Sequence, residues 1–143
     1  MVLPAGNFLM DRMGNVDYEL WRSLCLSMPG AYEDFPFGDE SAVYKVAGRD
    51  RSKTKMFALL MIRSGVVSLN LKCDPVLAEQ LRSANSQIKP GYHMNKQHWN
   101  TVTPGLDEEM MRNLIEDSYD LVVASLPRAE REVLNWKGLI ARG

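Results

Sequence analysis

The stretch MFALLMIRSGVVSLNLK, residues 56–72, decides the fold. Its first part, MFALLMI, is apolar throughout, which is typical of a central strand with both faces covered. Its second part, VVSLNLK, alternates apolar and polar residues, so that one face of the strand packs and the other stays polar. Arg63-Ser64-Gly65 joins the two parts as a tight hairpin. The polar positions of the second strand are Ser68, Asn70 and Lys72.

The sequence on either side of this hairpin supplies the remaining elements. Asn15 can cap a helix in which apolar residues recur at every fourth position. Asp74-Pro75 marks a second helix start, because it combines a carboxylate cap with a proline at the first helical position. We expect helices over 16–28, 76–85 and 106–126, further strands over 42–48, 88–94 and 98–103, and a short helix or adherent tail over 128–140.

This order of elements predicts an α+β domain of two layers, α-β(3)-α-β(2)-α, with a mostly antiparallel sheet and helices on one face. The other face of the sheet, which bears the polar residues of the second strand, is expected to be open.

Length and composition indicate one domain, residues 1–143. The longest apolar run, 57–62, is far shorter than the roughly 20 residues of a membrane-spanning helix, and the first residues lack the pattern of a signal peptide. We therefore expect a cytoplasmic protein with no membrane contact. Cys25 and Cys73 are too few and too far apart for a disulfide framework or a metal knuckle, so both are expected to be reduced, buried thiols.

Charge is unevenly distributed along the chain. The net charge is -1, but residues 45–100 contain 10 basic and 3 acidic side chains, whereas both flanking segments are acidic. A generic nucleic-acid binder is usually basic overall. A basic middle segment can still produce a local positive surface, if the fold gathers these side chains on one side of the molecule. The alternative is that they are scattered, solvated cations.

Both histidines lie in KPGYHMNKQHWNTV, residues 89–102. If residues 95 and 96 formed a two-residue turn, His93 and His98 would face each other across a hairpin. Zinc needs three or four protein ligands, however, and no third ligand is close in sequence. No nucleophile elbow, phosphate loop or paired-histidine helix motif is present either. We therefore expect no metal, no cofactor and no catalytic residues, and the simpler interpretation is that these side chains hold a hairpin together.

Four blocks of the sequence, taken together, resemble the bacterial MmcQ/YjbR family. They are MPGAYEDFPFG (28–38), LNLKCDP (69–75), PGYHMNKQHWNTV (90–102) and SYDLVVASLPRAER (118–131). The resemblance covers about 15–132, which leaves 1–14 as an N-terminal extension and 133–143 as a C-terminal tail. The turn at 48–55 departs from the family pattern because it is longer and more basic.

The resemblance implies a fold akin to the frataxin-like or secretion-chaperone-like arrangement. It also implies a small cytosolic protein commonly labelled "DNA-binding", a label based on a proposed double-wing shape. An uncharacterised non-enzymatic protein that contacts nucleic acid through basic hairpins and the polar sheet face is thus our first hypothesis. The candidate contacts are Arg49, Arg51, Lys53, Lys55, Asn70, Lys72, Lys89, His93, Asn95, Lys96, His98, Trp99 and Asn100.

The second hypothesis is an adaptor or binding module. It would hold a protein partner or a small anionic ligand on the open face, lined by Asn70, Lys72, His93 and Asn100. For Tyr92 and Trp99, packing across the sheet is an alternative to base stacking. The sequence does not decide the oligomeric state.

Overall fold

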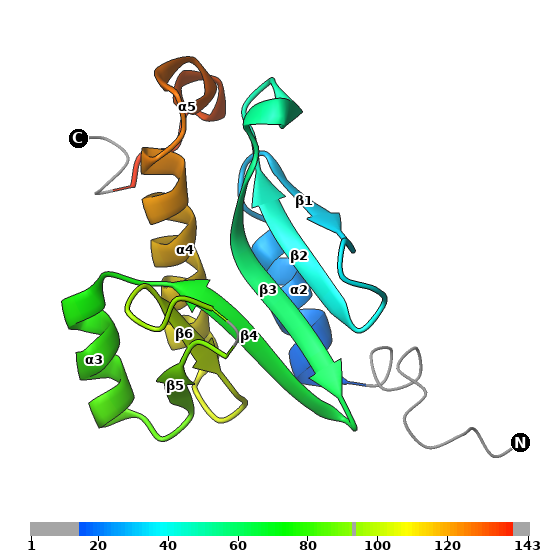
Figure 1. The fold of residues 1–143 in the computed structure, drawn as a ribbon, viewed down its shortest axis with the longest axis vertical. Coiled ribbons are helices and arrows are strands. Elements are labelled where there is room, and N and C mark those ends of the chain that lie inside the picture. The colour runs from blue at the N-terminus through cyan, green and yellow to red at the C-terminus, as the bar shows by residue number, and fades with distance from the viewer. Residues whose placement is uncertain (1–14, 93, 139–143) are drawn as a thin grey trace, which may run out of the picture.

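The computed structural model describes residues 15–92 and 94–138 as an open sheet with helices packed on it (Figure 1). The helices are α2 (Val16–Leu26), α3 (Pro75–Ala84), α4 (Glu108–Ala124) and α5 (Arg128–Leu134), with a single 3-10 turn, η1 (Arg51–Lys53). The strands are β1 (Ala31–Asp34), β2 (Ser41–Val46), β3 (Lys55–Arg63), β4 (Val66–Lys72), β5 (Ile88–Pro90) and β6 (Trp99–Val102).

The six strands form one antiparallel sheet in the order β1-β2-β3-β4-β6-β5. The hairpin that decided the fold lies at its centre, where β3 pairs with β4 through a two-residue turn. Ser64 and Gly65 in this turn both have positive φ, 51° and 76°, as the primed turns of tight hairpins require. The predicted α+β class and antiparallel sheet are therefore confirmed.

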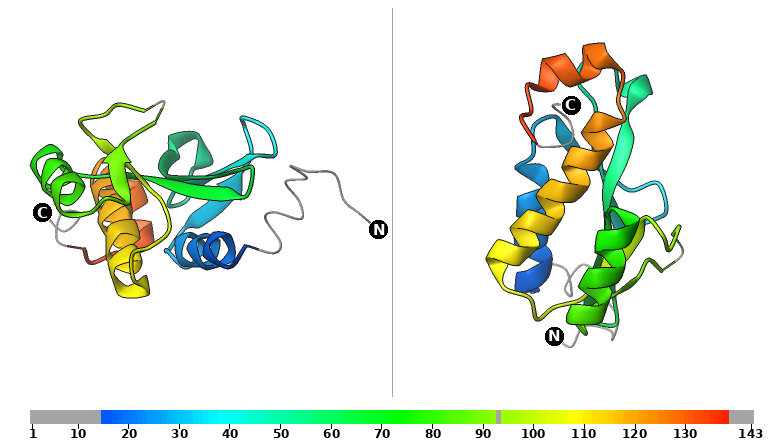
Figure 2. Two further views of the ribbon diagram at one scale, coloured as in Figure 1. Left: turned by 90° about the horizontal axis from the view of Figure 1, so that it is seen from below. Right: turned by 90° about the vertical axis from the view of Figure 1, so that its left-hand side faces the viewer.

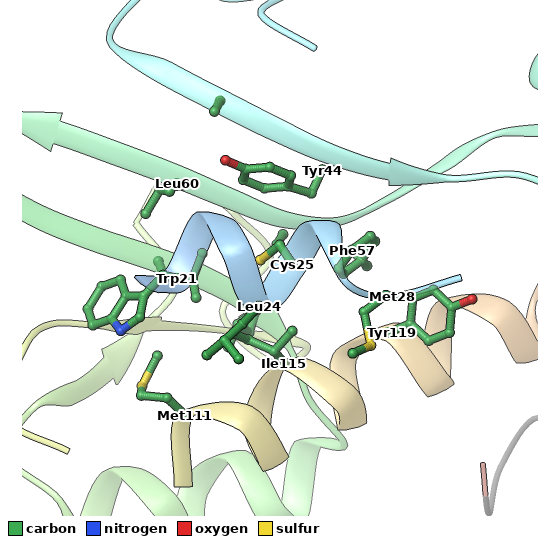
Figure 3. Packing of buried hydrophobic residues seen from close by; sticks show 14 of the residues in the cluster. Trp21, Leu24, Cys25, Met28, Tyr44, Phe57, Leu60, Met111, Ile115 and Tyr119 are labelled. Carbon is green, nitrogen blue, oxygen red and sulfur yellow. The ribbon is translucent and has the colours of Figure 1, made fainter. Parts of the chain in front are cut away.

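The core lies between the sheet and helices α2 and α4 (Figure 3). Trp21 of α2, Leu60 of β3 and Ile115 of α4 meet in this layer and are almost fully buried. Burial of one such side chain stabilises the fold by about 1.5–3 kcal/mol. Helix caps fix where the helices begin: the side chain of Asn15 accepts a hydrogen bond from the Tyr18 N–H, and that of Asp107 from the Met110 N–H.

Among the helices of the described residues, α2 and α4 cover the core face, whereas α3 packs at the β5–β6 end of the sheet (Figure 2). No helix of the described residues packs on the opposite face, which we call the helix-free face. The connections 35–40, 47–54 and 91–98 rise on this side in the left view of Figure 2. An open second face was predicted, but its central part is covered, because Val43, Leu59 and Asn70 lie there and are all buried.

Strand β1 was not predicted. Residues 31–34, AYED, contain two acids in a turn-rich segment, which argued against a strand. Both acids find a basic partner from another element: Arg22 of α2 lies 2.9 Å from Glu33, and Lys45 of β2 lies 2.9 Å from Asp34. These tertiary contacts explain why the segment forms an edge strand.

The remaining sequence predictions have mixed outcomes. Cys25 and Cys73 are free and buried as expected, and α5 forms within the segment expected to be a helix or tail. The N-terminal extension, 1–14, lies outside the described residues, as do the last five residues of the tail. None of the described helices combines the length and the hydropathy that crossing a membrane would require.

Candidate functional site

The pairing of β4, β6 and β5 places three candidate residues together on the helix-free face. Residues directly opposite in an antiparallel pair point to the same side of the sheet. Lys72 is paired with Trp99, Asn70 with Thr101, and Thr101 with Lys89. Lys72 and Trp99 are partly exposed and Lys89 is exposed, so a cationic and aromatic surface forms at this end of the sheet.

Asn70 lies beneath this surface and supports it. Its side chain is completely buried, and its Oδ1 accepts a hydrogen bond of 2.6 Å from the Thr101 hydroxyl. The same hydroxyl oxygen accepts a 2.9 Å hydrogen bond from the Tyr92 N–H. Asn70 therefore helps to anchor the 91–98 loop to the sheet, and its burial excludes it from direct contact with a large ligand.

The 91–98 loop is wider than the two-residue turn that would place His93 opposite His98. The last ladder pair is Pro90 with Asn100, so eight residues separate β5 from β6 and the predicted strands 88–94 and 98–103 are shorter. The condition for that register is therefore not met. His93 itself lies outside the described residues, and His98 is exposed.

Hydrogen bonds within the loop give it a defined shape. Asn95 accepts from the Gln97 N–H with its side chain and from the Trp99 N–H with its carbonyl. The Lys96 ammonium donates to the Gly91 carbonyl over 3.2 Å. A Cβ on Gly91 would lie 2.8 Å from the Trp99 Cβ, which is why glycine is needed there. Asn95, Lys96 and His98 remain exposed at the loop surface.

Asn100 points to the opposite side of the sheet. It is paired with Leu71, whose side chain belongs to the core, so the prediction that it lines the open face with Asn70 and Lys72 is wrong. Its Oδ1 is buried without a hydrogen-bond partner among the described residues. The adjoining cavity of about 10 Å³, next to α3 and α4, has room for about one water molecule.

The basic turn at 48–55 is a second projection from the helix-free side (Figure 2). It joins β2 to β3, whereas the 91–98 loop joins β5 to β6, so β4 lies between the two. Two of its cations are engaged: Arg51 stacks 3.9 Å above the Tyr32 ring, and Lys55 donates to the Ser125 carbonyl at the end of α4. Arg49 and Lys53 are exposed.

The turn is fixed to the rest of the molecule by a buried carboxylate. Oε1 of Glu130, on α5, accepts hydrogen bonds from the N–H groups of Gly48, Arg49 and Asp50 at 2.9–3.0 Å. Three convergent backbone donors form an anion-binding nest. The basic turn is therefore held at its base by an acidic side chain of the same protein.

Charges are segregated between the two layers. The six strands contain five basic and two acidic residues, and both of these acids are in ion pairs. Helices α2 and α4 contain seven acidic and two basic residues. Neither Lys72 nor Lys89 forms an ion pair within the described part of the chain. Of the cations predicted to converge, Lys72 and Lys89 are thus unpaired on the helix-free face among the described residues. Lys45 and Arg63 are instead paired with Asp34 and Glu40.

Two ionisable groups, one at each end of the sheet, have altered pKa values with clear causes. The hydrogen bond from Lys45 lowers the pKa of Asp34, with help from the Phe35 N–H. Burial raises the pKa of the Cys73 thiol to about 11, and the negative charges of Asp117 and Asp74 add to this effect. In residues 15–92 and 94–138, no three His, Cys, Asp or Glu side chains are placed to hold a metal ion.

Comparison with known proteins supports the family resemblance. The model of the YjbR family matches residues 26–121, two thirds of the chain. The chain belongs to the YjbR family. It is 38% identical to Uncharacterized protein YbdF of Escherichia coli O157:H7, with 80% of this chain and 91% of the relative covered. It is 30% identical to Uncharacterized protein YjbR of Escherichia coli K12, with 77% and 90% covered.

A solved family structure agrees with the fold. The crystal structure of Deinococcus radiodurans protein DR2400 superposes with a TM-score of 0.74 at 41% identity, and the match covers 88% of this chain and 91% of that one. The names of these relatives state no activity, so the family supports the fold and leaves the function to be argued from the site.

Sequence reasoning missed Arg82, which lies on α3 beside the 91–98 loop. Its Nη1 donates a 2.9 Å hydrogen bond to the Lys96 carbonyl. Fourteen positions separate the two residues, and only the packing of α3 against the β5–β6 end brings them together. No local pattern in the sequence signals this contact.

Proposed function

We propose that this protein binds single-stranded nucleic acid on the helix-free face, with Lys72, Lys89 and Trp99 at the centre of the contact. The segregation of charge supports this proposal most strongly. Phosphates are attracted to a surface with unpaired lysines, and the acidic helices α2 and α4 repel them from the opposite side of the molecule.

The arrangement of aromatic residues favours a single strand over a duplex. Trp99 is partly exposed beside Lys72, and Tyr92 is 56% exposed in the adjoining loop. Unpaired bases can stack on such rings while the neighbouring lysines contact phosphates. Reading the base sequence of a duplex would instead need an element that enters a groove. The cations of the basic turn, Arg49 and Lys53, extend the surface beyond β4.

The test is a fluorescence-anisotropy titration with a labelled ten-nucleotide strand at several salt concentrations. Three lysine contacts, Lys72, Lys89 and Lys96, predict a slope of log affinity against log salt of about -2, since each contact on a single strand contributes about -0.7. Lys72→Gln should reduce the slope by about 0.7. Arg112→Gln, which changes a cation on α4 that is paired with Glu108, is the matched control and should change neither slope nor affinity.

A slope near zero, or equal losses in the Lys72→Gln and Arg112→Gln variants, would show that the strand is not held by this face. An absence of binding at about 50 mM salt would have the same meaning.

A protein partner is the second candidate, because the helix-free side also has apolar residues. Phe37 in the 35–40 connection is 72% exposed, and Phe35 beside it is 37% exposed. Exposed aromatic side chains are common at protein contacts. Binding of a protein that is insensitive to salt and lost in Phe37→Ser, without nucleic-acid binding, would favour this candidate.

A further inference from the structure

A hollow beside the proposed surface lies between α3 and the 91–98 loop. It is a groove of about 420 Å³ lined by Pro75, Glu79, Arg82, Pro90, Lys96 and Gln97. This volume lies in the range of small-molecule sites, roughly 300–1,000 Å³. The cavity beside Asn100, at about 10 Å³, is too small for anything beyond one water molecule.

Two cations from different elements meet in this groove. Arg82 donates from Nη1 to the Lys96 carbonyl, and the Lys96 ammonium donates to the Gly91 carbonyl. Each contact uses one N–H, whereas a guanidinium has five donors and an ammonium three. Both side chains are therefore oriented by the protein and retain donors for a ligand. Neither forms an ion pair within the described ranges of the chain.

The helix side of the groove has a regular order. Pro75, Glu79 and Arg82 are at positions i, i+4 and i+7 of α3, so they lie along one stripe about 10 Å long. The stripe passes from an apolar ring to a hydrogen-bond acceptor and then to a cation. On the loop side, Pro90 adds a second apolar wall and Gln97 a side-chain amide. This sequence of chemical groups matches a base, a ribose and a phosphate.

We infer that this groove binds one nucleoside monophosphate unit. The phosphate lies between Arg82 and Lys96, a ribose hydroxyl donates to Glu79, and the base packs against the prolines. The nucleotide can be the phosphorylated 5′ end of a strand bound on the helix-free face, and in that case the inference rests on the proposed function. The same chemistry would also take a free nucleotide.

The experiment is a ¹⁵N–¹H NMR titration of the full chain with AMP, followed by anisotropy with a strand that has or lacks a 5′ phosphate. AMP should shift the amide signals of α3 and of the 91–98 loop. Lys96→Gln should weaken AMP binding about 10-fold, because charge-assisted hydrogen bonds to phosphate are among the strongest that a side chain forms. This substitution preserves the backbone carbonyl that Arg82 contacts.

Arg82→Gln should cause a similar loss, and Arg112→Gln none. Binding of AMP that depends on Lys96 supports the groove even if no strand binds the helix-free face, whereas strand binding that is indifferent to the 5′ phosphate, with no binding of AMP, supports the face alone. The inference is overturned if AMP shifts no groove signals and the 5′ phosphate adds nothing to strand affinity. It is also overturned if the Lys96→Gln and Arg112→Gln variants behave alike.

Discussion

Replacement of Glu130 by alanine should destabilise the protein far more than replacement of Glu132, the other acidic residue of α5. The Glu130 side chain is 7% exposed, and its Oε1 receives three backbone N–H groups from the turn before η1. A hydrogen bond to a charged group contributes about 1.5–3 kcal/mol. Arg49 and Asp50 are exposed, so water can replace part of this interaction, and we expect a total loss of about 2–4 kcal/mol.

The assay is unfolding by urea and by heat. A loss of 1 kcal/mol lowers the Tm of a domain of this size by roughly 3–4 °C, so Glu130→Ala should lower it by about 6–16 °C. Glu130→Gln keeps an acceptor but loses the charge, and should give an intermediate value. Glu132→Ala is the matched control, because Glu132 forms an exposed pair with Arg128 whose contribution is at most about 0.5 kcal/mol.

Equal unfolding midpoints for Glu130→Ala and Glu132→Ala would refute this reasoning. They would mean that the nest contributes nothing to stability and that the basic turn does not depend on α5.

Three smaller predictions concern the region between α3, α4 and β6. Asn100→Leu should raise stability by about 1 kcal/mol, since it removes a buried acceptor without a partner and fills a cavity; a lower midpoint in urea would show that the amide is satisfied. Burial raises the pKa of Asp117 above its usual 3.8, and the negative charges of Asp120 and Glu116 add to this effect. The ionised form of Asp117 therefore opposes folding above pH 3.8. Asp117→Asn should therefore increase the Tm at pH 7, with a gain that shrinks as the pH falls through the folded-state pKa and vanishes below 3.8; a gain independent of pH would contradict this. Because burial raises the pKa of Cys73 to about 11, its thiolate fraction at pH 8 is about 100-fold lower than that of a thiol with a pKa of 9.0, and a disulfide reagent should label it more slowly than an exposed thiol. Rapid labelling of this thiol would show that it is accessible and ionised.

The elements that could be predicted from the sequence are those determined by local patterns. Alternation in 66–72 identified β4 and its polar face, and Asp74-Pro75 identified the start of α3. Strand β1 could not be predicted, because its acids are neutralised by Arg22 and Lys45 from other elements. Local propensity cannot reveal such tertiary partners.

The candidate site was predictable as a set of residues and less so as a surface. Lys72 and Trp99 lie together as expected for neighbouring strands, but the side of the sheet that Asn100 faces depends on register, and a shift of one residue reverses it. The width of the 91–98 loop set that register. The contribution of Arg82 depends on where α3 packs, which no short-range pattern contains.

The indole N–H signals of the three tryptophans show directly whether a strand binds the helix-free face, because only one of these side chains lies on that face. Trp21 is 2% exposed in the core, and Trp136 donates its indole N–H to Asp120. On addition of an unlabelled ten-nucleotide strand at about 50 mM salt, we expect the Trp99 signal to shift and the other two to remain in place. A shift of Trp136 with no change at Trp99, or no shift at all, would contradict it.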